Sequence, residues 1–200
     1  MRKNQTKVEC FLFNKPYGVL CQFRDTDGRP TIGTYGKFPR DVYPAGRLDA
    51  DSEGLVLLTN DGELKHLLLE PKFRHPRTYL VQVERIPTGG SLEELRRGVM
   101  IEGRKTFPVE VRLLDHEPEI PPRPVPVRFR KTVPTAWLEI ILREGRNRQV
   151  RKMTAAVGHP ALRLIRIAIG LLTLGGLKPG ESRKLSAEEI TKLWDSLRKG

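Results

Sequence analysis

The sequence predicts an α+β fold around a mixed, largely antiparallel sheet. Strand-like and helix-like segments are interleaved, but they do not repeat with a regular βαβ period, and no glycine-rich phosphate loop joins them. With 38% apolar and 30% charged residues, the chain has the composition of a globular protein that buries a core. We expect residues 1–200 to form one compact unit, built as two lobes.

Seven segments have the pattern of strands. The first two flank a turn rich in proline and glycine, so the chain is expected to open with a β-hairpin. The third is almost wholly apolar, as in a buried strand, and two of the later ones alternate in polarity. In chain order, the expected strands are Val8 to Phe13, Val19 to Phe23, Leu55 to Thr59, Thr78 to Glu84, Val109 to Leu114, Trp137 to Leu142 and Leu162 to Ile169.

Four helices are expected from capping signals followed by apolar residues at helical spacing. The third of them, Asn147 to Val157, is expected to end at Gly158 in the C′ position. The other expected N-termini are Asn60 or Asp61, the capping box of Ser91 with Glu94, and the capping box of Ser186 with Glu189.

The charge of the chain points to a polyanionic partner. Lys and Arg total 36 against 24 Asp and Glu, a net charge of +12, and cations that neutralise phosphates release condensed counterions. A basic structural protein would show the same excess of positive charge. The charge therefore indicates the class of binding partner but not whether the chain is an enzyme. No apolar run is long enough for a membrane span or a signal peptide. We therefore expect a cytoplasmic protein.

Two further features are expected to be structural. Cys10 and Cys21 match no zinc or redox spacing, so we expect core thiols and no metal. The stretch from His116 to Pro134 is too rich in proline for the middle of a sheet, so it is expected to be a long surface loop or arm. It either touches RNA or is a connector that is basic because the whole chain is basic.

The densest group of polar residues lies in the segment from Tyr43 to Gly62. Arg47, Asp49, Asp51 and Glu53 occupy alternate positions, and an apolar strand follows them directly. Polar loops anchored to a rigid strand are common positions for catalytic groups. Three acids facing one cavity would disfavour one another's ionised form, so Asp51 and Glu53 are expected to be solvated. A calcium loop is disfavoured, because the later glycine and the bidentate Glu at loop position twelve are absent.

This segment, GRLDADSEGLVLLTNDG, resembles the catalytic motif of the pseudouridine synthases, specifically of the RsuA group that modifies ribosomal RNA. The resemblance continues through FNKPYGVLCQF, RTYLVQVE, EGRNRQVRKM and HPALRLIRIAIG, and so covers nearly the whole chain. It implies the two-lobed fold of that family with the active-site cleft between the lobes. It also implies that a uridine in large-subunit (23S) ribosomal RNA is isomerised without a cofactor. The small S4 RNA-binding domain that many members carry is not expected, because the resemblance starts at the first strand.

The resemblance also assigns roles to individual residues. Asp49 falls on the catalytic aspartate, which acts at C1′ or C2′ of the ribose. Arg47 matches the arginine that fills the gap left when the base leaves the stack, and Tyr79 matches the tyrosine that packs against the flipped base. Arg151 matches the basic residue that pairs with the aspartate, and Leu164 lines the pocket.

Other basic residues surround Arg151. From Arg143 to Arg166 there are seven Lys or Arg residues and one acid, Glu144. On a helix Arg148 and Arg151 share a face. We expect Arg146, Arg148 and Lys152 to contact the RNA backbone.

Simpler interpretations remain open beside these roles. A phosphate contact would also explain Arg151, and ordinary strand packing would explain Tyr79. We expect the chain to be a monomer. Two alternative functions remain open for it. One is a non-catalytic RNA-binding protein of ribosome assembly, and the other is an RNA glycosylase or nuclease that uses Asp49 and Asp51.

Overall fold

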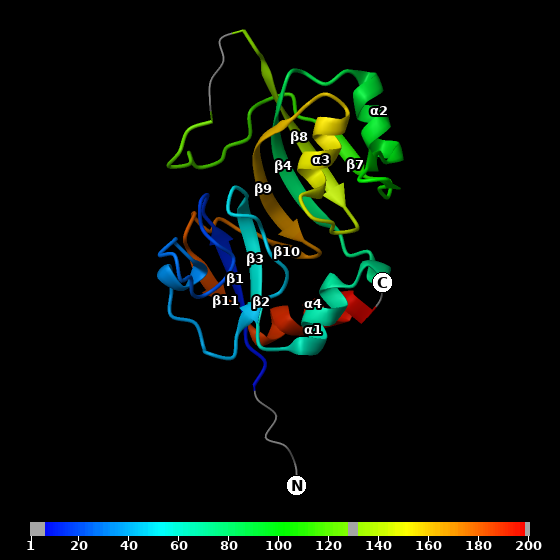
Figure 1. Ribbon diagram of the computed structural model, residues 1–200. Helices are drawn as coiled ribbons and strands as arrows, with labels where there is room; N and C mark the ends of the chain where they lie inside the picture. The colour runs from blue at the N-terminus through cyan, green and yellow to red at the C-terminus, as the bar shows by residue number, and fades with distance from the viewer. Residues whose placement is uncertain (1–6, 128–131, 199–200) are drawn as a thin grey trace.

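The computed structural model describes residues 7–127 and 132–198 (Figure 1). Its strands are β1 (Cys10–Lys15), β2 (Tyr43–Pro44), β3 (Glu53–Thr59), β4 (Arg77–Glu84), β5 (Met100–Ile101), β6 (Arg104–Lys105), β7 (Glu110–Leu113), β8 (Thr135–Leu142), β9 (Ala161–Ile169), β10 (Leu172–Thr173) and β11 (Ser182–Lys184). Its helices are α1 (Gly62–Leu69), α2 (Gly89–Arg97), α3 (Gln149–Ala156) and α4 (Ala187–Arg198), with single 3₁₀ turns at Ile32–Thr34 and Pro71–Phe73.

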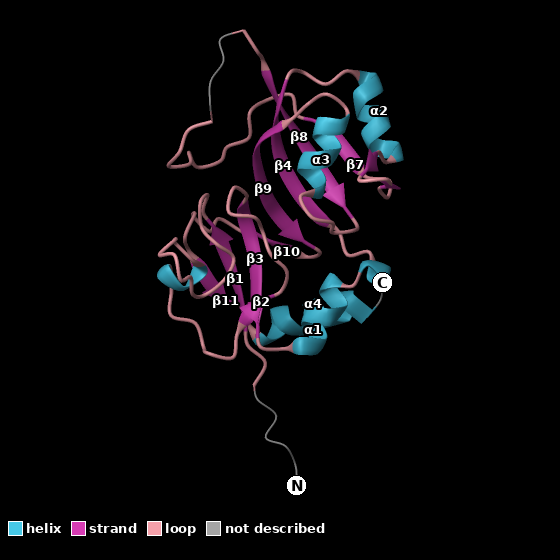
Figure 2. Cartoon of the chain, viewed as in Figure 1, coloured by secondary structure: helices cyan, strands magenta, loops and turns pink. Residues whose placement is uncertain are grey.

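One nine-stranded sheet passes through two lobes (Figure 2). Its order is β11-β1-β3-β9-β4-β8-β7, with β2 beside β3 and β10 beside β9. Neighbouring strands in this sheet are antiparallel, except that β3 and β9 meet in parallel over two residue pairs. The predicted α+β class and the largely antiparallel sheet are confirmed.

The apolar residues form a core that continues from one lobe into the other. The lower lobe in Figure 1 holds β1, β3 and β11 with α1 and α4, and the upper lobe holds β4, β7, β8 and β9 with α2 and α3. One buried cluster includes Val56 from the lower lobe and Leu138 from the upper lobe, and a second lies under α1 and α4. Cys10 and Cys21 are buried free thiols, as predicted. Among the described residues, no helix is both long and apolar enough to cross a membrane.

The predicted opening hairpin is wrong. β1 pairs with β3 and β11, while residues 19–23 form no strand and contribute a single bridge, from Leu20 to Thr31. Gly18, at φ +80°, turns the chain, and its amide donates to Ala50 O at 2.7 Å. Val19 and Cys21 are buried in the loop that follows. The apolar residues of this segment therefore reflect burial of a loop and not strand pairing.

Two helix starts also differ from the prediction. α2 begins at Gly89 because Thr88, a preferred N-cap residue, accepts a hydrogen bond from Ser91 N at 3.2 Å. α3 begins at Gln149 because the backbone of Arg148 is left-handed, at φ +51°. Asp61 as the cap of α1, the capping box at Ser186 and the C′ position of Gly158 are confirmed.

The proline-rich stretch is an irregular segment that lies against both lobes, although residues 128–131 fall outside the described part. Arg163 donates to Pro121 O at 2.8 Å, and the guanidinium of Arg123 lies 4.3 Å from the ring centroid of Tyr17. Ile120 packs on a small apolar cluster of the upper lobe. The expected loop is confirmed, but its described part is held in place instead of projecting freely. Contact with RNA stays a prediction.

The parallel contact between β3 and β9 joins the lobes. Gly54, at φ +104°, faces Arg166, and a Cβ at Gly54 would lie 2.2 Å from Arg166 O. Beside it, both carboxylate oxygens of Glu53 accept hydrogen bonds from Arg163 at 2.8 Å. Glu53 and Arg163 are both buried, so the expectation that Glu53 is solvated is wrong. Its burial is possible because the guanidinium supplies a bidentate, charge-matched partner.

We predict that Gly54→Ala destabilises the protein by more than 2–3 kcal/mol, because it combines the roughly 1–2 kcal/mol strain of a positive φ with a backbone clash. Gly158→Ala is the matched control, since Gly158 has φ +85° but no atom near its Cβ position. The measurement is the free energy of unfolding in urea. Equal losses for the two variants would show that the close approach of β3 to β9 does not require glycine.

Candidate active site

The loop that carries Asp49 connects β2 to β3 at the junction between the lobes. Ala45 N donates to Leu57 O at 2.7 Å, and Ser52 N donates to Asp49 O at 3.1 Å, which closes a turn around Asp49. The loop is therefore fixed to β3 at one end and folded on itself at the other. This geometry follows from the sequence order in which a polar segment runs directly into a buried apolar strand.

Lys15, at the end of β1, supports the same loop from below. It is fully buried, and its Nζ donates to Val19 O at 2.7 Å, Pro16 O at 3.0 Å and Ala50 O at 3.3 Å. Burial lowers the pKa of Lys15 to about 8, even though the nearby carboxylates favour its charged form. The peptide that follows Asp49 thus rests on a side chain from the first strand.

Asp49, Asp51 and Arg148 form a cluster of charges at the cleft. Arg148 Nη1 lies 3.3 Å from Asp49 Oδ2, while Nη1 and Nη2 donate to the two oxygens of Asp51 at 3.1 and 2.8 Å. Burial raises the pKa of Asp51, but the hydrogen bonds from Arg148 and the charges of Arg151 and Arg148 outweigh it, so that pKa lies below its usual range. All three side chains of the cluster are more than a third exposed, so solvent screens these contacts.

The expected pair of Arg151 with Asp49 is replaced by an ion pair of Arg148 with Asp49. Arg151 Nη2 donates to Asp51 O at 2.7 Å and to Ser52 Oγ at 3.4 Å, and its Nη1 donates to Ala161 O at 3.2 Å. Its Nε lies 3.5 Å from Asp51 Oδ2. Arg151 therefore holds the loop through Asp51 and Ser52 and does not line the cavity. Arg148 reaches Asp49 because its left-handed backbone places it just ahead of α3.

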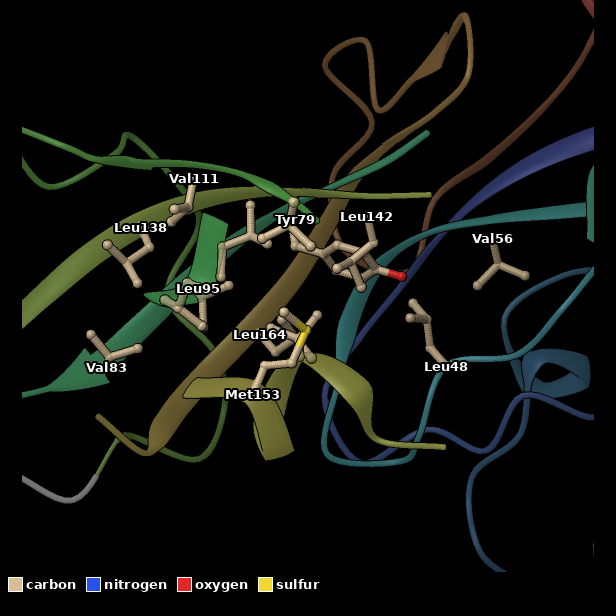
Figure 3. Close-up of a cluster of buried hydrophobic side chains, with 14 of the residues drawn as sticks. Leu48, Val56, Tyr79, Val83, Leu95, Val111, Leu138, Leu142, Met153 and Leu164 are labelled. Atoms are coloured by element: carbon tan, nitrogen blue, oxygen red, sulfur yellow. The ribbon is translucent and has the colours of Figure 1, made fainter. Parts of the chain in front are cut away.

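A cavity of about 310 Å³ lies between the lobes beside Asp49. Tyr79 from β4 and Leu164 from β9 form its apolar wall together with Leu142 and Val150, and Arg47 and Arg148 lie at its polar side. Tyr79 and Leu164 are mostly buried, and Figure 3 shows the Tyr79 ring pointing toward Leu48, in the loop that carries Asp49. The volume is at the lower end of the range for small-ligand pockets, which suits one flat ring.

Arg146 and Lys152, expected on the RNA backbone, both have partners within the protein. Arg146 donates to Glu144 at 3.2 Å and to the backbone oxygens of Arg104 and Lys105 at 3.2 and 2.7 Å. Lys152 pairs with Glu102 at 2.6 Å. Arg47, in contrast, is exposed at the cleft and has no hydrogen bond or ion pair among the described residues.

Sequence reasoning missed the network that shapes the far side of the cavity. The buried Glu144 accepts from Gln149 Nε2 at 2.6 Å and from Phe107 N at 2.8 Å, and Gln149 Oε1 accepts from Arg146 N at 3.0 Å. A signal was present, because Glu144 is the one acid in a strongly basic segment. Within residues 7–127 and 132–198, no group of three or more His, Cys, Asp or Glu could hold a metal ion.

Comparisons with known proteins agree with this arrangement. Residues 9–156 match the family model of the RNA pseudouridylate synthases. The chain is 56% identical over 170 residues to the ribosomal large subunit pseudouridine synthase E of Xanthomonas axonopodis pv. citri, covering 84% of this chain and 89% of that protein. It is 38% identical over 184 residues to the ribosomal large subunit pseudouridine synthase B of Bacillus subtilis, covering 92% of this chain and 70% of that one.

The fold agrees as well. A crystal structure of a pseudouridylate synthase superimposes with a TM-score of 0.77 at 31% identity, over 94% of this chain and 74% of the other. The match covers both lobes and the cavity between them. The chain therefore belongs to the RNA pseudouridylate synthase family.

Proposed function

We propose that this enzyme isomerises a uridine of large-subunit (23S) ribosomal RNA to pseudouridine, with Asp49 as the catalytic carboxylate. The observation that carries the proposal is the position of Asp49, beside a cavity walled by Tyr79 and Leu164 and 3.3 Å from the guanidinium of Arg148. The names of the relatives support the choice of large-subunit RNA. The net charge of +12 suits a polyanionic substrate.

The reaction requires a base outside its stack and an ionised carboxylate. Flipping the uridine costs roughly a few kcal/mol, and stacking on an aromatic side chain such as Tyr79 returns about 1–3 kcal/mol per base. The C1′–N1 bond then breaks, the uracil turns, and a C1′–C5 bond forms. C5 loses a proton and N1 gains one, so the isomerisation balances without a cofactor. Asp49 acts either as a nucleophile at C1′ or as a base at C2′.

The surrounding residues support these steps. Leu164 excludes water from the base, and Arg47 enters the gap that the base leaves in the RNA. Arg148 forms an ion pair with Asp49 at 3.3 Å and so holds the carboxylate in place at the edge of the cavity. Arg151 is a positioning residue that acts through the backbone of the loop. Lys152 breaks its ion pair with Glu102 and binds an RNA phosphate, whereas Arg146 keeps its hydrogen bonds within the protein.

The alternatives predict different products. An RNA-binding assembly protein would leave the RNA unchanged, and a glycosylase or nuclease would release a base or cut the strand. Pseudouridine formation alone expels the hydrogen of C5 while the strand stays intact. We further propose that residues 1–200 form a single catalytic unit that acts as a monomer in the cytoplasm.

We predict that Asp49→Asn abolishes tritium release from large-subunit rRNA transcribed with 5-tritiated uridine, with a rate loss of at least about 10²–10⁴-fold. RNA affinity should be retained, because the amide preserves the shape of the side chain. Asp115→Asn is the matched control, since Asp115 is exposed and does not line the cavity. Normal release by Asp49→Asn, or none by the wild type even with precursor particles, would refute the proposal.

We predict that Arg151→Lys lowers the single-turnover rate about 10- to 150-fold, the factor that about 1.5–3 kcal/mol for a charged hydrogen bond corresponds to. An ammonium cannot reach Asp51 O, Ser52 Oγ and Ala161 O together as a planar fork does. Because Arg151 holds the loop and not the RNA, RNA affinity should change little. Arg112→Lys, on the exposed face, serves as the control. A wild-type rate for Arg151→Lys would rule out the bracing role.

A further inference from the structure

A second groove, of about 520 Å³, opens on the lower lobe beside the catalytic cavity. Its lining includes Phe23, Tyr43 and Leu69 as apolar surface and Arg47 and Lys65 as cations. Arg47 lines both spaces, so the groove adjoins the cavity proposed for the target base. Apart from Arg47, these lining residues take no part in the proposed catalytic steps or in the charge cluster around Asp49.

Tyr43 presents an exposed ring from a rigid position in this groove. The residue is 56% exposed, although tyrosine is a large and mostly apolar side chain. Its backbone pairs with Thr59 in the fully buried strand β3, which fixes the direction of the side chain. Within the described part of the chain, the ring contacts no other aromatic side chain and its hydroxyl makes no hydrogen bond. An exposed aromatic ring held this way is the usual platform for an unpaired base.

The two cations of the groove are also unengaged. Lys65 is exposed on α1, and neither Lys65 nor Arg47 has an ion pair among residues 7–127 and 132–198. Cations and an exposed aromatic ring in the same groove match a strand that carries phosphates and flat, unpaired bases. This complementarity favours single-stranded RNA over a protein partner as the occupant.

The groove is close enough to the target to hold the same RNA strand. Tyr43 and Asp49 are six positions apart in the chain, so their Cα atoms lie at most about 22 Å apart. Gly46, between them, lies tightly on the helix α1, because a Cβ there would be 2.8 Å from Leu69 Cδ2. A nucleotide at Tyr43 would therefore be within a few positions of the flipped uridine.

We propose that this groove is a second RNA subsite, in which an unpaired base near the target uridine stacks on Tyr43 and Lys65 contacts a backbone phosphate, while Arg47, which lines both spaces, fills the gap left by the flipped uridine. The proposal deepens the proposed function and rests on it for the identity of the RNA. The subsite gives the enzyme a second point of attachment. It would select targets that have unpaired neighbours on one side.

The test measures RNA affinity in the Asp49→Asn background, where turnover cannot interfere, with the large-subunit rRNA transcript as the probe. Tyr43→Ala should weaken binding about 5- to 150-fold, the factor for about 1–3 kcal/mol of stacking, and leave the salt dependence unchanged. Tyr43→Phe should bind normally, because the ring is kept. Lys65→Gln should lower the slope of log Kd against log salt by about 0.7–0.9, as for one lost phosphate contact.

The control is Tyr35→Ala, which removes another exposed tyrosine that does not line the groove and should leave RNA affinity unchanged. Thermal unfolding of each variant verifies folding. Wild-type affinity for Tyr43→Ala, or equal losses for Tyr43→Ala and Tyr43→Phe, would overturn the subsite. In the otherwise wild-type enzyme, Tyr43→Ala should raise KM for tritium release and preserve kcat. If wild type releases no tritium but the affinity losses occur, the subsite stands and the proposed reaction fails.

Discussion

The parallel contact between β3 and β9 sets the position of the Asp49 loop relative to the wall of the cavity. β3 carries the Asp49 loop at its start, and β9 carries Leu164 in the wall of the cavity. The two strands meet over only two residue pairs, where Gly54 permits a close approach and Arg166 Nε donates to Leu55 O at 2.7 Å. A shift here would move the carboxylate relative to the pocket wall. The close approach at Gly54 and the hydrogen bond from Arg166 therefore leave this short contact little freedom to shift.

Asp49, Asp51 and Glu53 carry like charges close together in the sequence, and each of these carboxylates forms an ion pair with an arginine. Asp49 and Asp51 share Arg148, Arg151 adds its charge beside Asp51, and Glu53 is paired with the buried Arg163. Of the three acids, only Asp49 lines the cavity. Asp49 and Asp51 lie in a turn that faces Arg148, just ahead of α3, and Arg151 of α3, whereas Glu53 opens β3 and faces Arg163 of β9. The three carboxylates are thus each paired with an arginine, and they do not all face the cavity.

Much of this arrangement could be predicted from the sequence, and the errors have physical causes. The buried strand after Asp49 and the helix caps at Asp61 and Ser186 follow from local patterns, and these predictions are confirmed. The pairing of β1 with β11 joins segments about 170 residues apart, which no local pattern indicates. The exchange of Arg148 for Arg151 at Asp49 depends on one left-handed residue, and propensity does not predict such a conformation for arginine.

The seven basic residues from Arg143 to Arg166 show that a high density of Lys and Arg in the sequence does not by itself locate an RNA-binding surface. Each of them has a partner within the protein: carboxylates for Arg143, Arg146, Arg148, Lys152 and Arg163, and backbone oxygens for Arg151 and Arg166. A cation with a protein partner must lose that contact before it binds a phosphate, which reduces the gain from binding. Arg47 and Lys65 have no such contact to lose within residues 7–127 and 132–198. In the proposed complex, Arg47 and Lys65 therefore contribute more to RNA affinity per cation than the residues of the densest basic segment.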